Sequence, residues 1–233
     1  MVEEFASGAV KVLSRRPFRR AAQQTLVGRN RSAGHPERGR FTETDLDRLL
    51  SGMWQRYDAL SDRLPAEPGL GPKMNIRLAC ATFAFYQQLT ANGTEPEHAI
   101  ELIGDAAWTI YRKWGLLPRL IARARSNDQA ERLRIPIDLF LRFPFSRPAY
   151  RYERSTPSPG VVAIDMRRCP IADYLAAHDA RELCVGTWCN PDFALAELWG
   201  GRLERTTTIA ARCDHCDFRF IAGRRARAST TTG

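Results

Sequence analysis

The hydrophobic pattern of this chain changes its period near residue 150. Before that point, apolar residues recur every three or four positions over residues 41–57, 74–91, 97–114 and 116–134, which is the spacing of amphipathic helices. The stretch "IPIDLFLRFPFSRP" is expected to end the helical pattern, because it holds three prolines, and "YRYERST" and "VVAIDMRR" then alternate as two antiparallel strands would. This order predicts an α+β fold, in which an N-terminal helical layer packs on a C-terminal antiparallel sheet with short helices.

Local features refine this arrangement. The first helix has a capping threonine, because Thr42 and Thr44 are each followed three residues later by an aspartate. Cys80 and His98 lie in the helical half, where we expect a packed thiol and a surface imidazole, the common structural roles of such lone residues. In the second half, "IADYLAAHDA" and "CNPDFALAELW" predict short helices, and "GGRLERTTTIA" with "CDFRFIA" predicts a closing pair of strands.

The formal net charge of +9 is concentrated at the ends of the chain. Residues 1–40 hold nine Lys and Arg against three Glu, and the tail contributes three arginines, so the body between them is neutral. Basic ends on a neutral body are typical of solvated tails and argue against a nucleic-acid partner. We therefore expect a basic, flexible segment over residues 1–40, one domain over residues 41–223 and a basic tail over residues 224–233.

The compartment follows from what the sequence contains. "SRRPF" resembles a twin-arginine export signal, but the stretch after it, "RRAAQQTLVGRNR", is interrupted by charged and amide residues, and no run of about 18 apolar residues could span a membrane. Six cysteines without an export signal indicate free thiols in a reducing compartment. We expect a cytoplasmic protein with a small-molecule partner and no membrane partner; a homo-oligomer is compatible with the sequence.

Cysteines concentrate in the second half of the chain, where they allow two interpretations. In the first, the C-x-x-C spacing in "TTTIAARCDHCDF" joins the looser C-x4-C spacing in "CVGTWCNPDF" as a structural zinc site. Its ligands would be Cys184, Cys189, Cys213 and Cys216.

The second interpretation uses a thiolate in place of a metal, so that no cofactor is needed. Cys169 follows the predicted strand "VVAIDMRR" and precedes a helix that begins at Pro170. The unpaired N–H groups at a helix N-terminus stabilise an anion, and Pro suits the first helical turn because it has no N–H to leave unpaired. This position predicts a reactive thiol at Cys169.

Over residues 41–220, the chain resembles the L-2-amino-thiazoline-4-carboxylic acid hydrolase family. The specific part of the resemblance is an ordered set: Cys169-Pro170, Cys189 with Asp192-Phe193, Glu204-Arg205 with Thr208, and Cys216-Asp217-Phe218. The resemblance implies that Cys169, Asp192, Thr208 and Cys216 are functional positions and that Cys213 is an additional cysteine of this chain. It also marks a departure, because Arg212 stands where similar members have glycine.

The reaction that the resemblance implies is the hydrolytic opening of a cyclic amidine. Water adds at the carbon between the ring nitrogen and sulfur, and the C–S bond breaks. We assign Cys169 as nucleophile or thiolate base, Asp192 as partner of the amidinium, Cys216 as acid or second thiol, and Thr208 as hydrogen-bond donor. Asp192 also suits the N-terminus of the helix "FALAELW".

Further expectations concern substrate binding and the alternatives to this reaction. Arg205 and Arg219 are candidates to bind a substrate carboxylate, and Cys189 is a further substrate-binding candidate. Two alternatives stay open. One is a zinc-stapled ligand-binding or scaffold domain, and the other is a divergent biosynthetic enzyme of the same fold that acts on another heterocycle.

Overall fold

A computed structural model describes residues 15–223 of the chain. After an unlabelled helix over residues 15–26, the elements in the order of the chain are η1 (Pro36–Arg38), α2 (Glu43–Ser61), α3 (Leu70–Ala91), α4 (Pro96–Arg125), α5 (Gln129–Arg142), β1 (Arg151–Ser155), β2 (Val161–Arg168), α6 (Pro170–Ala177), α7 (Arg181–Cys184), η2 (Val185–Cys189), α8 (Pro191–Leu198), β3 (Gly201–Glu204), η3 (Ile209–Ala211) and β4 (Cys216–Ala222). The predicted α+β fold is confirmed. Both predicted strand pairs and both predicted short helices of the second half are present.

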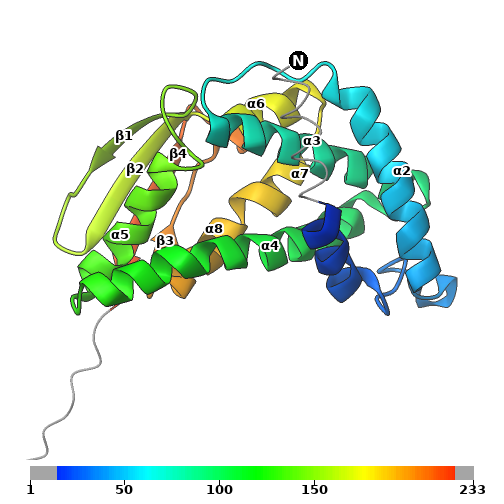
Figure 1. Ribbon diagram of the computed structural model, residues 1–233, viewed down its shortest axis with the longest axis horizontal. Coiled ribbons are helices and arrows are strands. Elements are labelled where there is room, and N and C mark those ends of the chain that lie inside the picture. Colours follow the sequence, from blue (N-terminus) through cyan, green and yellow to red (C-terminus); the bar gives the residue numbers. More distant parts are fainter. Residues whose placement is uncertain (1–14, 224–233) are drawn as a thin grey trace, which may run out of the picture.

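The four strands form one antiparallel sheet in the order β1-β2-β4-β3. The sheet lies at one end of the molecule, α5 crosses one of its faces, and the long helix α4 extends from α5 toward α2 at the other end (Figure 1). In the register of β2 with β4, Ile164 lies opposite Phe218 and Met166 opposite Cys216. Because side chains alternate along a strand, these pairs share one face of the sheet, the face that borders the site described below.

The first long helix begins as the sequence predicts. Thr42 caps α2: its hydroxyl accepts the Asp45 N–H at 3.2 Å, and the Asp45 carboxylate accepts the Thr42 N–H at 2.9 Å. This reciprocal capping box satisfies two of the donors that a helix N-terminus leaves unpaired.

The prediction that the proline-rich stretch ends the helical half was wrong at its first proline. Helix α5 continues through Pro136 to Arg142. Its inner face, formed by Leu133, Ile137 and Phe140, is buried against the sheet, and this burial outweighs the hydrogen bond that a mid-helix proline removes.

The chain is packed well before the boundary predicted at residue 41. The helix over residues 15–26 buries Ala22 and Leu26 completely, and the ring of Phe18 packs edge-on against Phe85 with 5.4 Å between centroids. The helix was not predicted, because the arginines of residues 15–20 make the composition of this segment resemble that of a solvated basic tail. The predictions for residues 1–14 and 224–233 lie outside the described residues.

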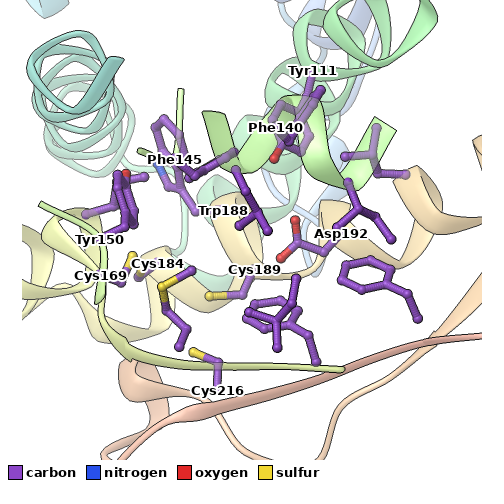
Figure 2. A pocket seen from close by; sticks show the side chains of 18 of the residues that line it. Tyr111, Phe140, Phe145, Tyr150, Cys169, Cys184, Trp188, Cys189, Asp192 and Cys216 are labelled. Carbon is purple, nitrogen blue, oxygen red and sulfur yellow. The ribbon is translucent and has the colours of Figure 1, made fainter. Parts of the chain in front are cut away.

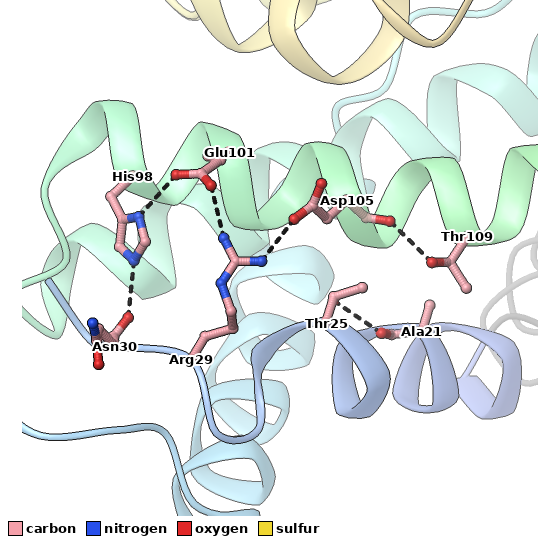
Figure 3. A network of polar contacts seen from close by, with 8 residues as sticks. All are labelled: Ala21, Thr25, Arg29, Asn30, His98, Glu101, Asp105 and Thr109. Atoms are coloured by element: carbon pink, nitrogen blue, oxygen red, sulfur yellow. Dashed lines mark hydrogen bonds and ion pairs between the residues drawn. The ribbon is translucent and has the colours of Figure 1, made fainter. Parts of the chain in front are cut away.

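The segment that follows this helix is fixed to α4 by a polar network (Figure 3). Arg29 forms ion pairs with two carboxylates on successive turns of α4, Glu101 at 2.7 Å and Asp105 at 2.9 Å. His98 has Glu101 on one ring nitrogen, at 3.2 Å, and the Asn30 carbonyl oxygen on the other, at 2.9 Å. His98 is only 6% exposed, so the predicted surface imidazole was wrong: the packed N-terminal segment covers it.

The interior consists of two clusters of buried side chains. One joins residues 15–26 with α2, α3, α6 and α7; the other joins α5 and α8 with the sheet. Cys80 is fully buried in the first cluster, as predicted. Phe145, Tyr152 and Phe218 pack against both clusters, and a cavity lies at this junction.

Close approaches at two glycines hold the second half of the chain on α4. A β-carbon at Gly186 would lie 2.3 Å from Ile100 Cγ2, and one at Gly115 would lie 2.5 Å from Leu195 Cδ1. A side chain at either position would require Ile100 or Leu195 to move. None of the helices within residues 15–223 combines the length and apolar composition needed to cross a bilayer.

Candidate active site

A cavity of about 110 Å³ lies between α5, the sheet and the segment from α6 to α8. One water needs roughly 10–15 Å³ of such space, so the cavity has room for a small molecule. Its walls are mostly apolar and aromatic, with Phe140, Phe145 and Trp199 among them. The thiols and the carboxylate of the lining (Figure 2) are those of Cys169, Cys184, Cys189, Cys216 and Asp192.

The sheet brings Cys169 and Cys216 to one end of the cavity. Cys169 follows directly after β2, and Cys216 is the first residue of β4. Because β2 and β4 are antiparallel, the end of one strand lies beside the start of the other. Both thiols line the cavity, although 46 residues of sequence separate them.

The other two cavity cysteines come from a widened helical turn. The short helix α7 continues directly into η2, a π-helix, in which the Asn190 N–H donates to the Val185 carbonyl at 2.9 Å. Cys184 ends α7 and Cys189 ends η2, and both side chains line the cavity. A single π-helical turn of this kind is often found at a functional site. Asp192, in the first turn of α8, follows three residues later.

Asp192 is the charged residue of the cavity lining. Its carboxylate points to the side on which Cys189 lies (Figure 2). Arg205 donates a hydrogen bond to this carboxylate at 3.2 Å. Burial raises the pKa of Asp192 to about 7, although the charge and hydrogen bond of Arg205 act in the opposite direction. A carboxyl group with this pKa can hold a cation or exchange a proton near neutral pH.

Burial favours the protonated form of the Cys169 and Cys216 thiols. Burial raises the pKa of Cys169 well above its usual range, and the backbone N–H groups of Ala172 and Ile171 only partly oppose this. The predicted stabilisation by the N-terminus of α6 is therefore present but weaker than desolvation. Arg168, which directly precedes Cys169, is bound to Glu67 at 2.6 and 2.9 Å. Its charge is therefore not available to stabilise a Cys169 thiolate.

Cys216 differs from Cys169 in having a hydrogen bond to its sulfur. The Ile209 N–H donates to Cys216 Sγ at 3.3 Å. Burial raises the pKa of Cys216 to about 12, and this N–H and the charge of Arg205 lower it in part. If Cys216 loses its proton, the resulting thiolate keeps this donor.

A comparison with known families found a match that covers this site. The family model of L-2-amino-thiazoline-4-carboxylic acid hydrolase matches residues 74–220, which covers most of the chain and every cavity residue named above. The chain belongs to this hydrolase family. A comparison with curated proteins found no match.

Two predicted site residues do not line the cavity: Thr208, which the family resemblance implies, and Arg219, a candidate to bind a substrate carboxylate. Thr208 caps η3: its hydroxyl accepts the Ala211 N–H at 3.0 Å, which shapes the turn that presents the Ile209 N–H to Cys216. Arg219 lies on the opposite face of β4 from Cys216 and pairs with Asp165 at 2.8 Å. The prediction that Arg219 binds substrate fails because of strand alternation.

Arg205 also lies outside the cavity. Its side chain is 4% exposed, donates to the Cys189 carbonyl at 3.0 Å as well as to Asp192, and lies over the rings of Phe193 and Phe218. The structure places it behind Asp192, where it orients the carboxylate. It is not where a substrate carboxylate could reach it.

The four cysteines of the zinc interpretation are not brought together. Cys184, Cys189 and Cys216 line the cavity, whereas Cys213 lies in the turn outside it. Within residues 15–223, no group of three or more His, Cys, Asp and Glu side chains is arranged to hold a metal ion. The residues present therefore do not fit the zinc site that the spacing predicted.

The departure at Arg212 has a backbone explanation. Arg212 has φ 69° and ψ 19°, in the left-handed region, directly after η3. Glycine adopts this conformation without steric cost, which explains why it suits this position in similar members. Arg212 does not line the cavity, so this substitution leaves the lining itself unchanged.

Sequence reasoning did not identify two aromatic residues of the site. Neither Tyr111, on α4, nor Trp188, between the two cysteines of "CVGTWCNPDF", was predicted as a site residue. Both line the cavity, and the Trp188 Nε1–H is buried with no partner among the described residues. A tryptophan between two cysteines was the available sequence signal, but only the π-turn shows which way it faces.

Proposed function

We propose that this chain hydrolyses a small cyclic amidine of the 2-amino-thiazoline type by cysteine chemistry, with cleavage of the ring C–S bond. One observation carries the proposal: the thiols of Cys169 and Cys216 and the carboxylate of Asp192 line the same cavity. Their chemistry matches what opening such a ring requires, namely a nucleophile, an acid for the leaving sulfur and an anion for the amidinium. Family membership supports the same reaction class.

Asp192 provides the anion. A cyclic amidine is a base, and its protonated form spreads a positive charge over two nitrogens. Inside a cavity with apolar walls, the attraction between this charge and the Asp192 carboxylate is stronger than in water. The pKa of Asp192, raised by burial to about 7, leaves a substantial ionised fraction at neutral pH.

Cys169 is the nucleophile and is activated by the substrate. The neutral amidine takes the proton of the Cys169 thiol, which produces a thiolate and an amidinium side by side. The thiolate adds to the ring carbon between nitrogen and sulfur, and the ring C–S bond breaks. Cys216 gives its proton to the departing ring sulfur, and the Cys216 thiolate is held by the Ile209 N–H.

Hydrolysis then restores both thiols. Water adds to the carbon that is now bonded to Cys169, and its proton goes to the Cys216 thiolate. The bond from this carbon to Cys169 breaks, and Cys169 recovers a proton from the hydroxyl group that becomes the product carbonyl. The product is an N-carbamoyl compound with a free thiol, which equals the substrate plus one water.

The test is incubation of the purified chain with L-2-amino-thiazoline-4-carboxylate and with the unsubstituted 2-amino-2-thiazoline, with product masses as the readout. We expect ring opening of at least one compound, and a Cys169→Ser variant should lose at least about 100-fold in kcat/KM. Cys213→Ser is the matched control, because Cys213 lies outside the cavity. The proposal fails if neither ring is opened or if Cys169→Ser retains full activity.

A further inference from the structure

The charge of the cavity lining limits what the substrate can carry. Asp192 is negative, and none of the residues that line the cavity within the described chain is Lys, Arg or His. L-2-amino-thiazoline-4-carboxylate bears a carboxylate next to its ring, and burying a carboxylate without a cation or several donors is costly. The lining thus provides for the amidine half of that molecule but not for its acid half.

The cations near the cavity are already bound to other groups. Arg205 lies behind Asp192 and between two aromatic rings, and Arg219 pairs with Asp165 on the other face of the sheet. Arg168 is bound to Glu67. None of these three arginines lines the cavity, and Arg205 would have to give up Asp192 to reach a substrate.

A second apolar space lies beside the cavity. A smaller cavity of about 70 Å³ lies between α3, α4 and η2, and Tyr111 and Trp188 line both cavities. Its other walls include Phe18, Leu78 and Trp114. The two side chains therefore form a partition, and beyond it lies room for an apolar group.

The partition itself offers neutral hydrogen-bond donors. The Trp188 Nε1–H is buried and has no partner among residues 15–223. Burial raises the pKa of Tyr111 well above its usual range, so its hydroxyl stays protonated and can donate. A buried donor without a partner costs free energy that a ligand acceptor would recover. An uncharged carbonyl fits such donors better than a carboxylate does, because no net charge is buried.

From this we infer that the substrate is a 2-amino-thiazoline-type amidine whose carboxyl group is masked as an amide or ester and carries an apolar substituent. The inference rests on the proposed function for the reacting ring. The ring amidine would lie at Asp192, the masked carbonyl at Trp188, and the substituent toward the second cavity. The reaction keeps the same balance, since one water is consumed and the masked carboxyl group is unchanged.

The inference is tested by binding, separately from turnover. Dissociation constants for L-2-amino-thiazoline-4-carboxylate, its benzylamide and 2-amino-2-thiazoline are measured by calorimetry on Cys169→Ser, which prevents turnover. We expect the benzylamide to bind at least about tenfold more tightly than the free acid. Equal or tighter binding of the free acid overturns the inference. Tight binding of the benzylamide with no ring opening by the unmodified chain overturns the proposed reaction instead.

A pair of variants tests the partition. Trp188→Phe should weaken benzylamide binding about three- to tenfold and leave 2-amino-2-thiazoline unchanged, because only the benzylamide has a carbonyl for the indole N–H. Trp199→Phe is the matched control: its Nε1–H already donates to the Gly115 carbonyl at 3.1 Å, so its loss should affect both ligands alike. If Trp188→Phe also affects both ligands alike, the partition does not recognise the carbonyl.

Discussion

Arg205 binds Asp192 from outside the cavity, with its Nη1 3.2 Å from Asp192 Oδ2. The guanidinium is held between the rings of Phe193 and Phe218 and also donates to the Cys189 carbonyl. One buried cation thus fixes the carboxylate that faces the cavity and the last residue of the π-turn. Arg205 is a positioning residue in this arrangement.

The first prediction concerns the charge of Arg205. Arg205→Gln removes a cation that lowers the pKa of Asp192, so this pKa should rise further above about 7. If ionised Asp192 binds the amidine, kcat/KM should rise with pH, and this rise should move to higher pH in the variant. A shift of about one pH unit lowers the ionised fraction of Asp192, and with it kcat/KM, about fivefold at neutral pH and about tenfold well below it.

The measurement is the pH profile of kcat/KM for the best substrate. Arg205→Lys should return the profile part of the way, because it keeps the charge. Arg219→Gln, on the other face of the sheet, serves as the matched control and should leave the profile in place. An Arg205→Gln profile that is lower at every pH without any shift would assign Arg205 a purely structural role.

A second prediction links Asp192 to stability. Folding raises the pKa of Asp192 from its ordinary value of 3.8 to about 7, so between these values the folded state binds more protons than the unfolded state. The contribution of Asp192 to the free energy of unfolding should therefore fall as pH rises from about 4 to about 7 and stay constant above that range.

Urea unfolding of the unmodified chain and of Asp192→Asn at several pH values measures this effect. The difference in unfolding free energy, unmodified chain minus variant, should decrease over that window, since Asn does not titrate. Taking the difference cancels the pH dependence of all other groups. A difference that increases with pH would mean that the Asp192 pKa is lowered by folding.

The third prediction reverses an expectation from sequence. Cys169 was expected to be the most reactive thiol, but burial raises its pKa well above the usual range. Since the thiolate is the form that reacts, limiting iodoacetamide at neutral pH should modify Cys213, in the turn outside the cavity, before Cys169. Peptide mapping reads out the order, and fully buried Cys80 serves as the unreactive reference. Preferential modification of Cys169 in the unliganded chain would contradict the burial argument.

The fourth prediction concerns the N-terminal helix. Leu26 is fully buried, so Leu26→Ala should lower the free energy of unfolding by about 2–5 kcal/mol. Leu70 is 73% exposed, and Leu70→Ala should change it by no more than about 0.5 kcal/mol. Urea unfolding of both variants gives the comparison. Equal, small effects would show that residues 15–26 contribute little to the fold, as their composition suggested.

Sequence patterns predicted those parts of the fold that depend on local periodicity. The capping box of Thr42, the β1–β2 hairpin and the helix after Pro170 each follow from spacing within a few residues. The helix over residues 15–26 and the passage of α5 through Pro136 could not be predicted this way, because burial against distant residues stabilises both.

The candidate site shows the same division. The family resemblance identified Cys169, Asp192 and Cys216, which the sheet and α8 bring to one cavity. It could not separate Arg205, behind Asp192, from Arg219, on the far face, since only the strand register decides which way each side chain points. It also could not show that Thr208 acts on Cys216 through a turn.

The π-turn at Val185–Cys189 has a consequence for how this site could change during evolution. One helical residue corresponds to a rotation of about 100°, so removal of a single codon within the turn would restore α-helical phase and swing α8 around its axis. Asp192 would then leave the cavity, and Leu195 and Ala196 of the same helix would leave the second core cluster. The π-turn thus ties the site to the core: a one-codon deletion there would remove the carboxylate and disturb the packing of α8 in a single step.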